Sequence, residues 1–136
     1  MSTAIAQGKE KAFVFGGNAT FTLQSGITGK HYTYKVKKAK DRNGLYFASL
    51  MTGRDNVSDY TYMGILTTDG LILTNASKCT KKSIPVVALD FFMRHIEKVP
   101  KNLGVFHEGR CCCCGRKLTT PSSILKGIGP ECEKYF

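Results

Sequence analysis

Hydrophobic and polar residues alternate over several short stretches between residues 11 and 73, a pattern typical of β-strands. In the clearest stretch, from His31 to Lys37, the apolar residues Tyr32, Tyr34 and Val36 share one face and basic and polar residues share the other. The run Ala12-Phe13-Val14-Phe15 is interpreted as the first strand. About six such stretches are separated by turn residues, which predicts an antiparallel meander or small barrel over residues 11–103.

A helical spacing follows the strand pattern. Apolar residues recur at intervals of three and four between Val86 and Ile96, while Pro85 fits the first turn of a helix and Pro100 follows its end. The pattern predicts one amphipathic helix over residues 84–98, packed against the sheet. The fold class is therefore α+β, with residues 1–10 as a flexible start.

Charge adds a functional expectation. The 136 residues contain 20 Lys and Arg against 10 Asp and Glu, a formal net charge of +10. A basic balance of this size is typical of proteins that bind nucleic acid or another polyanion, including acidic protein surfaces. The sequence begins without a signal peptide and contains no stretch long enough to span a membrane, so we expect a cytoplasmic protein with no membrane partner.

The cysteines are concentrated near the end of the chain. Four of the six are adjacent at residues 111–114, and another stands at 132. In the reducing cytoplasm such clusters usually bind metal. A Cys-x2-Cys-Gly turn, the zinc knuckle, directs its two outer sulfurs at one ion, so Cys112 and Cys113 are expected to be free thiols at the edge of the site.

Residues 104–136 are thus predicted to be a treble-clef-like module around a structural Zn²⁺, which would replace a core that a segment this short cannot build. The predicted ligands are His107, Cys111, Cys114 and Cys132, with His95 and then a shifted Cys112 or Cys113 as alternatives to His107. The sequence shows no arrangement of a general acid or base beside these ligands and no thioredoxin-like pattern around the Cys-x2-Cys pair. We therefore expect neither enzymatic activity nor a small-molecule substrate.

The string Cys-x2-Cys-Gly-Arg-x-Leu-Thr-x-Pro-x-Ser-Ile-x2-Gly-Ile-Gly-Pro-x-Cys, from Cys111 to Cys132, resembles an uncharacterised cysteine domain common in bacteriophage and prophage proteins. The His-Glu-Gly-Arg stretch that begins at His107 is similar to that family too. The resemblance covers residues 107–136 and implies metal binding and a phage-like origin, which would place the protein in a bacterial host cytoplasm. This sequence departs from the family by placing Cys112 and Cys113 inside the knuckle.

Two basic surfaces are candidates for binding nucleic acid. The first is the polar face of the 31–37 stretch with its flanks, and the second is the cysteine module. The candidate residues are Lys30, Lys35, Lys37, Lys38, Lys40, Arg42, Arg110, Arg116, Lys117 and Lys126.

Three functions are consistent with these patterns. The first is a non-enzymatic, phage-type accessory protein that binds DNA or RNA and contains a structural zinc site. The second is a phage inhibitor, anti-CRISPR-like for example, that binds a host protein or nucleoprotein complex. The third is a small metal-dependent nuclease, although the carboxylates Asp55, Asp59 and Asp69 are irregularly spaced for such a site.

Overall fold

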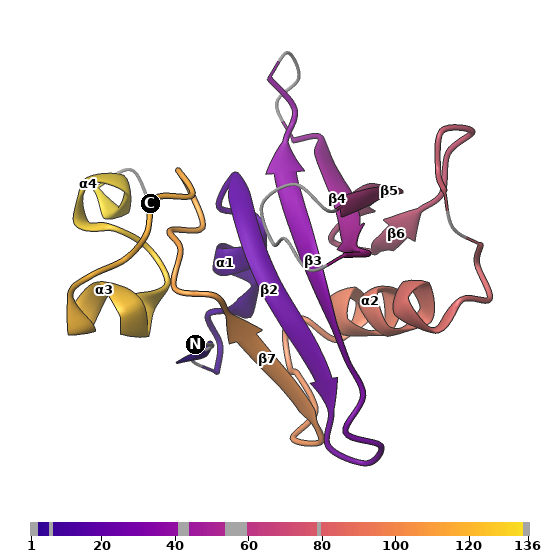
Figure 1. Cartoon of the computed structure of the whole chain (residues 1–136), viewed down its shortest axis with the longest axis horizontal. Coiled ribbons are helices and arrows are strands. Elements are labelled where there is room, and N and C mark those ends of the chain that lie inside the picture. Colours follow the sequence, from indigo (N-terminus) through magenta and orange to yellow (C-terminus); the bar gives the residue numbers. More distant parts are fainter. Residues whose placement is uncertain (1–2, 6, 41–43, 54–59, 79, 135–136) are drawn as a thin grey trace.

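A single antiparallel sheet organises the protein (Figure 1). The computed structural model describes residues 3–5, 7–40, 44–53, 60–78 and 80–134. Within these residues seven strands lie in the order β1-β7-β2-β3-β4-β5-β6. The strands are β1 Thr3–Ala4, β2 Asn18–Ser25, β3 His31–Lys38, β4 Tyr46–Met51, β5 Tyr60–Thr67, β6 Gly70–Ile72 and β7 Leu103–His107. The helices in the same residues are α1 Glu10–Val14, α2 Ile84–Arg94, α3 Pro121–Lys126 and α4 Pro130–Glu133.

Strands β2 to β6 form a meander, because each pairs with the strand that follows it in the chain. The chain then passes through α2 and returns as β7, which pairs with the other side of β2 and carries β1 on its far edge. The predicted antiparallel β-rich architecture is confirmed, and the described residues add short helices to the one amphipathic helix that was predicted. Of the two predicted forms, the structure is the meander, extended on one side by β7 and β1.

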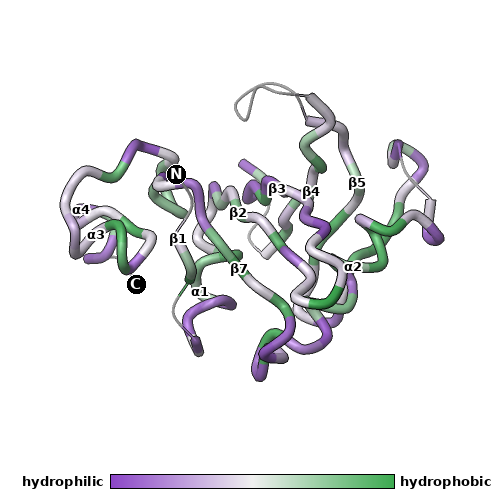
Figure 2. Tube along the Cα trace, turned by 60° about the horizontal axis from the view of Figure 1, so that its bottom comes forward, coloured by the Kyte–Doolittle hydropathy of each residue, from purple (hydrophilic) through white to green (hydrophobic). Residues whose placement is uncertain are grey.

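One face of the sheet is buried against helix α2. The ring of Phe21 on β2 lies 5.8 Å from that of Phe92 on α2 and 5.7 Å from that of Tyr34 on β3, measured between centroids. The Tyr34 hydroxyl donates a 2.7 Å hydrogen bond to the carbonyl oxygen of Pro85, and burial, followed by the charge of Tyr32, raises the Tyr34 pKa. The predicted inward face of β3 is confirmed. Figure 2 shows hydrophobic stretches on α2 and within the strands, and hydrophilic ones at turns.

Two element predictions were wrong. The segment interpreted as a first strand is helix α1, in which the adjacent residues Phe13 and Val14 are both buried in the same core. A strand would have turned one of them away, because successive side chains in a strand point to opposite faces. Helix α2 ends at Arg94 rather than at residue 98. The backbone of His95 no longer has helical dihedral angles, although its N–H still donates to the carbonyl of Phe91 in the last turn of the helix.

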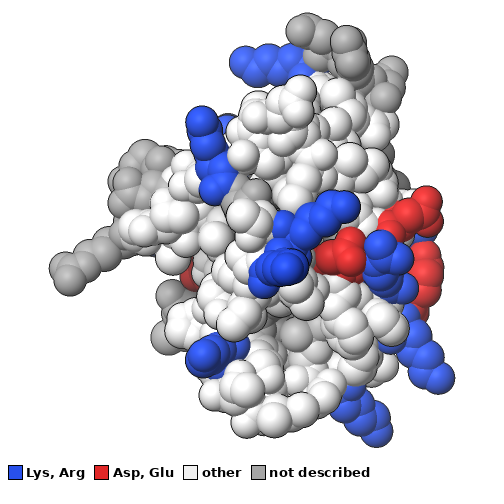
Figure 3. All heavy atoms as spheres, turned by 90° about the vertical axis from the view of Figure 1, so that its right-hand side faces the viewer, with Lys and Arg blue, Asp and Glu red and all other residues white. Residues whose placement is uncertain are grey.

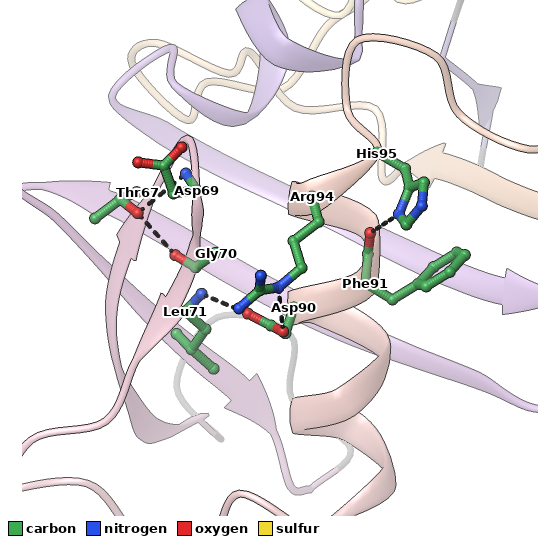
Figure 4. A network of polar contacts seen from close by, with 8 residues as sticks. All are labelled: Thr67, Asp69, Gly70, Leu71, Asp90, Phe91, Arg94 and His95. Carbon is green, nitrogen blue, oxygen red and sulfur yellow. Dashed lines mark hydrogen bonds and ion pairs between the residues drawn. The ribbon is translucent and has the colours of Figure 1, made fainter.

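Helix α2 is fastened to the edge of the sheet by Asp90 (Figure 4). One carboxylate oxygen accepts a 3.0 Å bond from the backbone N–H of Leu71 on β6, and the other accepts a 2.8 Å bond from Arg94. Gly70 has a φ of +138°, and a Cβ built there would lie 2.4 Å from the Asp90 carboxylate. The absence of a side chain at residue 70 therefore lets the helix approach the strand closely.

Strand β7 connects the sheet to the cysteine segment. The sequence prediction began the zinc module at residue 104, but Leu103–His107 is a strand that pairs with β2 over five residues. The segment that carries the cysteines therefore starts after β7, directly beside the sheet.

Candidate metal centre and basic sheet face

Residues 110–117 form a tight hairpin. Arg110 and Lys117 make an antiparallel bridge, the Cys111 N–H donates to the Arg116 carbonyl at 2.9 Å, and the Gly115 N–H donates to the Cys111 carbonyl at 2.9 Å. Gly115 closes the turn at a φ of +78°, a left-handed conformation that favours glycine. The hairpin places Cys111 and Cys114 at the two ends of one turn.

Three sulfur atoms converge at this hairpin. The Sγ atoms of Cys111, Cys114 and Cys132 all lie within 4.8 Å of one another, with Cys132 supplied by the short helix α4. Thiolates at this spacing could share one cation, so the three cysteines form a candidate metal centre. The geometry brings together three of the four predicted ligands.

Backbone N–H groups prepare Cys111 for this role. Its Sγ accepts hydrogen bonds from Gly129 N at 3.3 Å and from Cys113 N at 3.4 Å. Burial raises the Cys111 pKa, but the bonds from Gly129 and Cys113, together with the backbone and thiol of Cys114, outweigh burial and lower it to about 7. The pKa of Cys132 is raised by burial and by bonds to the neighbouring thiols of Cys113, Cys114 and Cys111. Without a cation, Cys111 therefore loses its proton more readily than Cys132 does. A bound cation would displace the remaining thiol protons.

His107 lies outside this sulfur cluster. It is buried at the end of β7, where its Nδ1 accepts a 3.0 Å bond from Gly109 N and its Nε2 lies 2.6 Å from the Ile124 carbonyl oxygen. Because Nδ1 is an acceptor, Nε2 carries the proton and donates it to Ile124. Burial lowers the His107 pKa, against the opposing effects of Ile124 and Glu108. Nε2 thus ties β7 to α3 and Nδ1 binds the backbone just after β7, and this geometry leaves neither nitrogen for a metal.

Cys112 belongs to the core rather than to the edge of the site. It is 4% exposed, and burial, with the charges of neighbouring thiols, raises its pKa to about 12. Its carbonyl accepts a 2.7 Å bond from Asn18 N, and a Cβ built on Gly16 would lie 2.6 Å from its sulfur. Cys113 is half-buried, and its thiol lies outside the cluster of three converging sulfurs. His95, the other alternative ligand, instead stacks on Phe91 of α2.

A groove of about 200 Å³ opens beside the three sulfurs. It is lined by all three cysteines and by the exposed side chains of Arg116 and Lys117. Of the other predicted basic residues in this segment, Arg110 donates to the Gly115 carbonyl and Lys126 pairs with Glu133 at 3.0 Å. These two cations are therefore used in holding the segment together.

The first predicted basic surface, the polar face of the 31–37 stretch, lies on the sheet face opposite α2. Lys35 and Lys37 project from β3 on this face. Of the other predicted residues, Lys30 lines a pocket beside α2, and Lys38 and Lys40 are exposed at and just beyond the end of β3. Arg42 lies outside the described residues, as do Asp55, Asp59 and Cys79. Figure 3 shows, from the side where β6 and α2 lie, lysine and arginine side chains dispersed over the surface.

Sequence reasoning missed the aromatic residues on that same face. The pairing of β3 with β4 and of β4 with β5 aligns Lys37 with Phe47, and Lys35 with Ser49 and Tyr62. The Lys35 ammonium lies 4.6 Å from the ring centroid of Tyr60, and the rings of Phe47 and Tyr62 meet edge to face at 6.1 Å. Alternation within β5 indicates that Tyr60 and Tyr62 share a face, but strand pairing was needed to place them beside the lysines. We call Lys35, Lys37, Phe47, Tyr60 and Tyr62 the basic aromatic face.

Within the part of the chain that the structure describes, none of the helices has the length and hydrophobicity of a membrane span. No curated protein and no solved structure matches the chain. Residues 102–136 match the model of a family described as a family of unknown function, DUF6011. The match covers β7 and the whole cysteine segment, and it excludes strands β1 to β6. The C-terminal segment is therefore similar to a family of unknown function. The same segment contains the cysteine cluster that could hold a metal ion.

Proposed function

We propose that the protein is a non-enzymatic accessory protein that binds single-stranded nucleic acid on its basic aromatic face. The observation that carries the proposal is the placement of Lys35 over the ring of Tyr60, on the same face as Lys37. Lysines neutralise phosphates, and aromatic rings stack on unpaired bases, so a sheet face that offers both suits a single strand. A duplex keeps its bases stacked internally and would use only the lysines.

The ion proposed for the cysteine centre is Zn²⁺, because soft thiolate ligands select zinc among the common cytosolic divalent ions. Its role in the proposal is structural. The cysteine segment packs on the start of β2 through Cys112 and on β7 through His107, so an ion that fixes the hairpin and α4 also fixes this end of the sheet. The resemblance of the segment to a domain common in phage proteins supports a phage-type accessory role.

Fluorescence anisotropy tests the proposal with the zinc-loaded protein and short single- and double-stranded DNA and RNA, at two salt concentrations. We expect single strands to bind more tightly than duplexes and to lose affinity as salt rises, with a slope of about 0.7 per phosphate contact. Lys37→Glu should weaken binding and reduce that slope, whereas Lys98→Glu makes the same charge change beyond α2 and serves as the control.

A second variant separates stacking from charge. Tyr62→Leu keeps an apolar side chain on β5 but removes the ring, and we expect it to weaken single-strand binding by roughly 1–3 kcal/mol without changing the salt slope. The stacking role would be contradicted if the wild type bound duplex as tightly as single strand, or if Tyr62→Leu bound single strand as tightly as the wild type. Unchanged binding by Lys37→Glu would place any nucleic-acid site elsewhere.

A further inference from the structure

Helix α2 is apolar on two sides, and only one of them faces the sheet. Val86, Leu89 and Phe92 are buried in the core, whereas Ile84, Val87 and Phe91 are 58%, 52% and 44% exposed. The exposed three are spaced i, i+3, i+7 and form one ridge along the helix. A helix that is hydrophobic around most of its circumference is usually buried on all sides, so this ridge is an unusual feature of a free surface.

The ridge borders two adjoining grooves. One, of about 290 Å³, lies between α2 and the start of β7 and is lined by Val87 and Phe91. The other, of about 200 Å³, lies toward Tyr32. Both are also lined by Ser25, Ile84, Ala88 and Leu103, so they form one continuous depression. His95 stacks on Phe91 with ring centroids 4.2 Å apart and holds that ring in place (Figure 4). We call Ser25, Ile84, Val87, Ala88, Phe91 and Leu103 the α2 groove.

The charges around the α2 groove have one sign. Lys30 lines the depression on the side of Tyr32, and exposed Lys82 lies two residues before Ile84 in the chain. Among the described residues no Asp or Glu lines either part of the depression. Asp90, the acid on α2, is turned to β6 and Arg94 (Figure 4).

We propose that the α2 groove binds an amphipathic helix of another protein, one whose apolar ridge is flanked by acidic residues. An apolar ridge spaced i, i+3, i+7 beside a groove is the geometry that receives a second helix. The basic rim selects acidic flanks and disfavours a second copy of this chain, which would oppose lysine to lysine at a net charge of +10 on each molecule. Nucleic acid fits the α2 groove less well than a helix does, because four of its six residues are aliphatic and offer neither stacking nor hydrogen bonds.

Two synthetic peptides provide the test. Both carry the same leucines at helical spacing, and one has glutamates and the other lysines at the flanking positions. Anisotropy with the full-length zinc-loaded protein should show binding of the glutamate peptide and at least roughly tenfold weaker binding of the lysine peptide. Val87→Glu should abolish binding of the glutamate peptide. Leu125→Glu is the matched control, because Leu125 is a 64% exposed leucine on α3, away from the groove.

Since Val87 is half exposed, its replacement should leave the fold intact, which circular dichroism verifies. Failure of both peptides to bind, equal binding of the two, or binding unaffected by Val87→Glu would overturn the proposal. A dimer in analytical ultracentrifugation that Val87→Glu dissociates would assign the groove to a second copy. Displacement of the glutamate peptide by a single-stranded oligonucleotide would assign it to nucleic acid. Either result would also refute the proposed occupant.

Discussion

The imidazole of His107 donates a 2.6 Å hydrogen bond from Nε2 to the carbonyl oxygen of Ile124, which ties strand β7 directly to the end of helix α3. The same ring accepts from Gly109 N at 3.0 Å and lies against Phe13, 5.6 Å between centroids. A histidine that spans three segments in this way has a structural role independent of any metal.

The variant His107→Phe keeps a ring against Phe13 and removes both hydrogen bonds. It leaves the Gly109 N–H and the Ile124 carbonyl, both part-buried, without these partners, so we expect the free energy of unfolding to fall by about 1–3 kcal/mol. Urea denaturation measures this change. Metal analysis of the same variant should show an unchanged zinc content, and loss of one zinc per chain from the folded variant would show that His107 is a ligand after all.

The buried His107 also predicts a pH dependence. Its folded-state pKa lies below the unfolded value of about 6.5, so as pH falls the unfolded chain takes up this proton first. Its stabilising contribution is complete above that value and decreases as pH falls toward the folded-state pKa. We expect zinc-loaded wild type to lose more stability than His107→Phe between about pH 7.5 and about pH 5.5. Thiolate protonation affects both proteins alike, so parallel losses would contradict the prediction.

Single cysteine substitutions should separate the cluster from its neighbours. Cys111→Ser and Cys132→Ser each remove one of the three converging sulfurs, and we expect both to lose the metal and to unfold the hairpin and α4. Cys112→Ser should keep the metal yet lower the melting temperature, because it places a hydroxyl where a buried thiol packs on Gly16. Metal analysis measures the zinc content of each variant, and thermal melts measure its melting temperature. Full zinc in Cys132→Ser would refute the assignment.

Asp90 offers a test of how the helix is held. Asp90→Ala leaves the Leu71 N–H without its acceptor and frees Arg94, so we expect a loss of about 1.5–3 kcal/mol in the free energy of unfolding. Arg94→Ala removes only the exposed ion pair and should cost less than about 1 kcal/mol. Equal effects of the two variants in chemical denaturation would mean that the backbone bond contributes little.

Gly16→Ala probes the contact between the turn after α1 and the cysteine hairpin. Its new Cβ would lie 2.6 Å from the Cys112 sulfur and 2.7 Å from the Cys112 carbonyl oxygen, so the hairpin must shift. We expect a destabilisation of about 1–3 kcal/mol. Gly129→Ala is the control, since its Cβ would meet nothing closer than 3.9 Å. Similar melting temperatures for Gly16→Ala and wild type would show that the contact is loose.

Sequence patterns predicted the meander, the inward face of β3 and helix α2, because each depends on local periodicity. They failed at α1, where a short apolar run fits a strand and a helix equally well, and five residues are too few to show a period. The pairing of β7 with β2 joins segments about eighty residues apart, and no local signal reports it.

The candidate site divides in the same way. The spacing Cys-x2-Cys-Gly predicted that Cys111 and Cys114 converge, because a turn that short has few geometries. The role of His107 depends on whether Gly109 and Ile124 reach its nitrogens, which only the folded arrangement reveals. Tyr60 and Tyr62 were overlooked for the same reason, since their neighbours on the basic aromatic face come from another strand.

The position of Cys112 couples two quantities that are usually measured separately. Its side chain belongs to the same core cluster as Phe21 and Phe92, while the adjacent Cys111 belongs to the candidate metal centre. If the ion binds only the folded chain, its affinity is thermodynamically linked to the packing of the sheet. A zinc titration would then report on substitutions in the middle of β2, and the apparent dissociation constant becomes a gauge of the integrity of the whole fold.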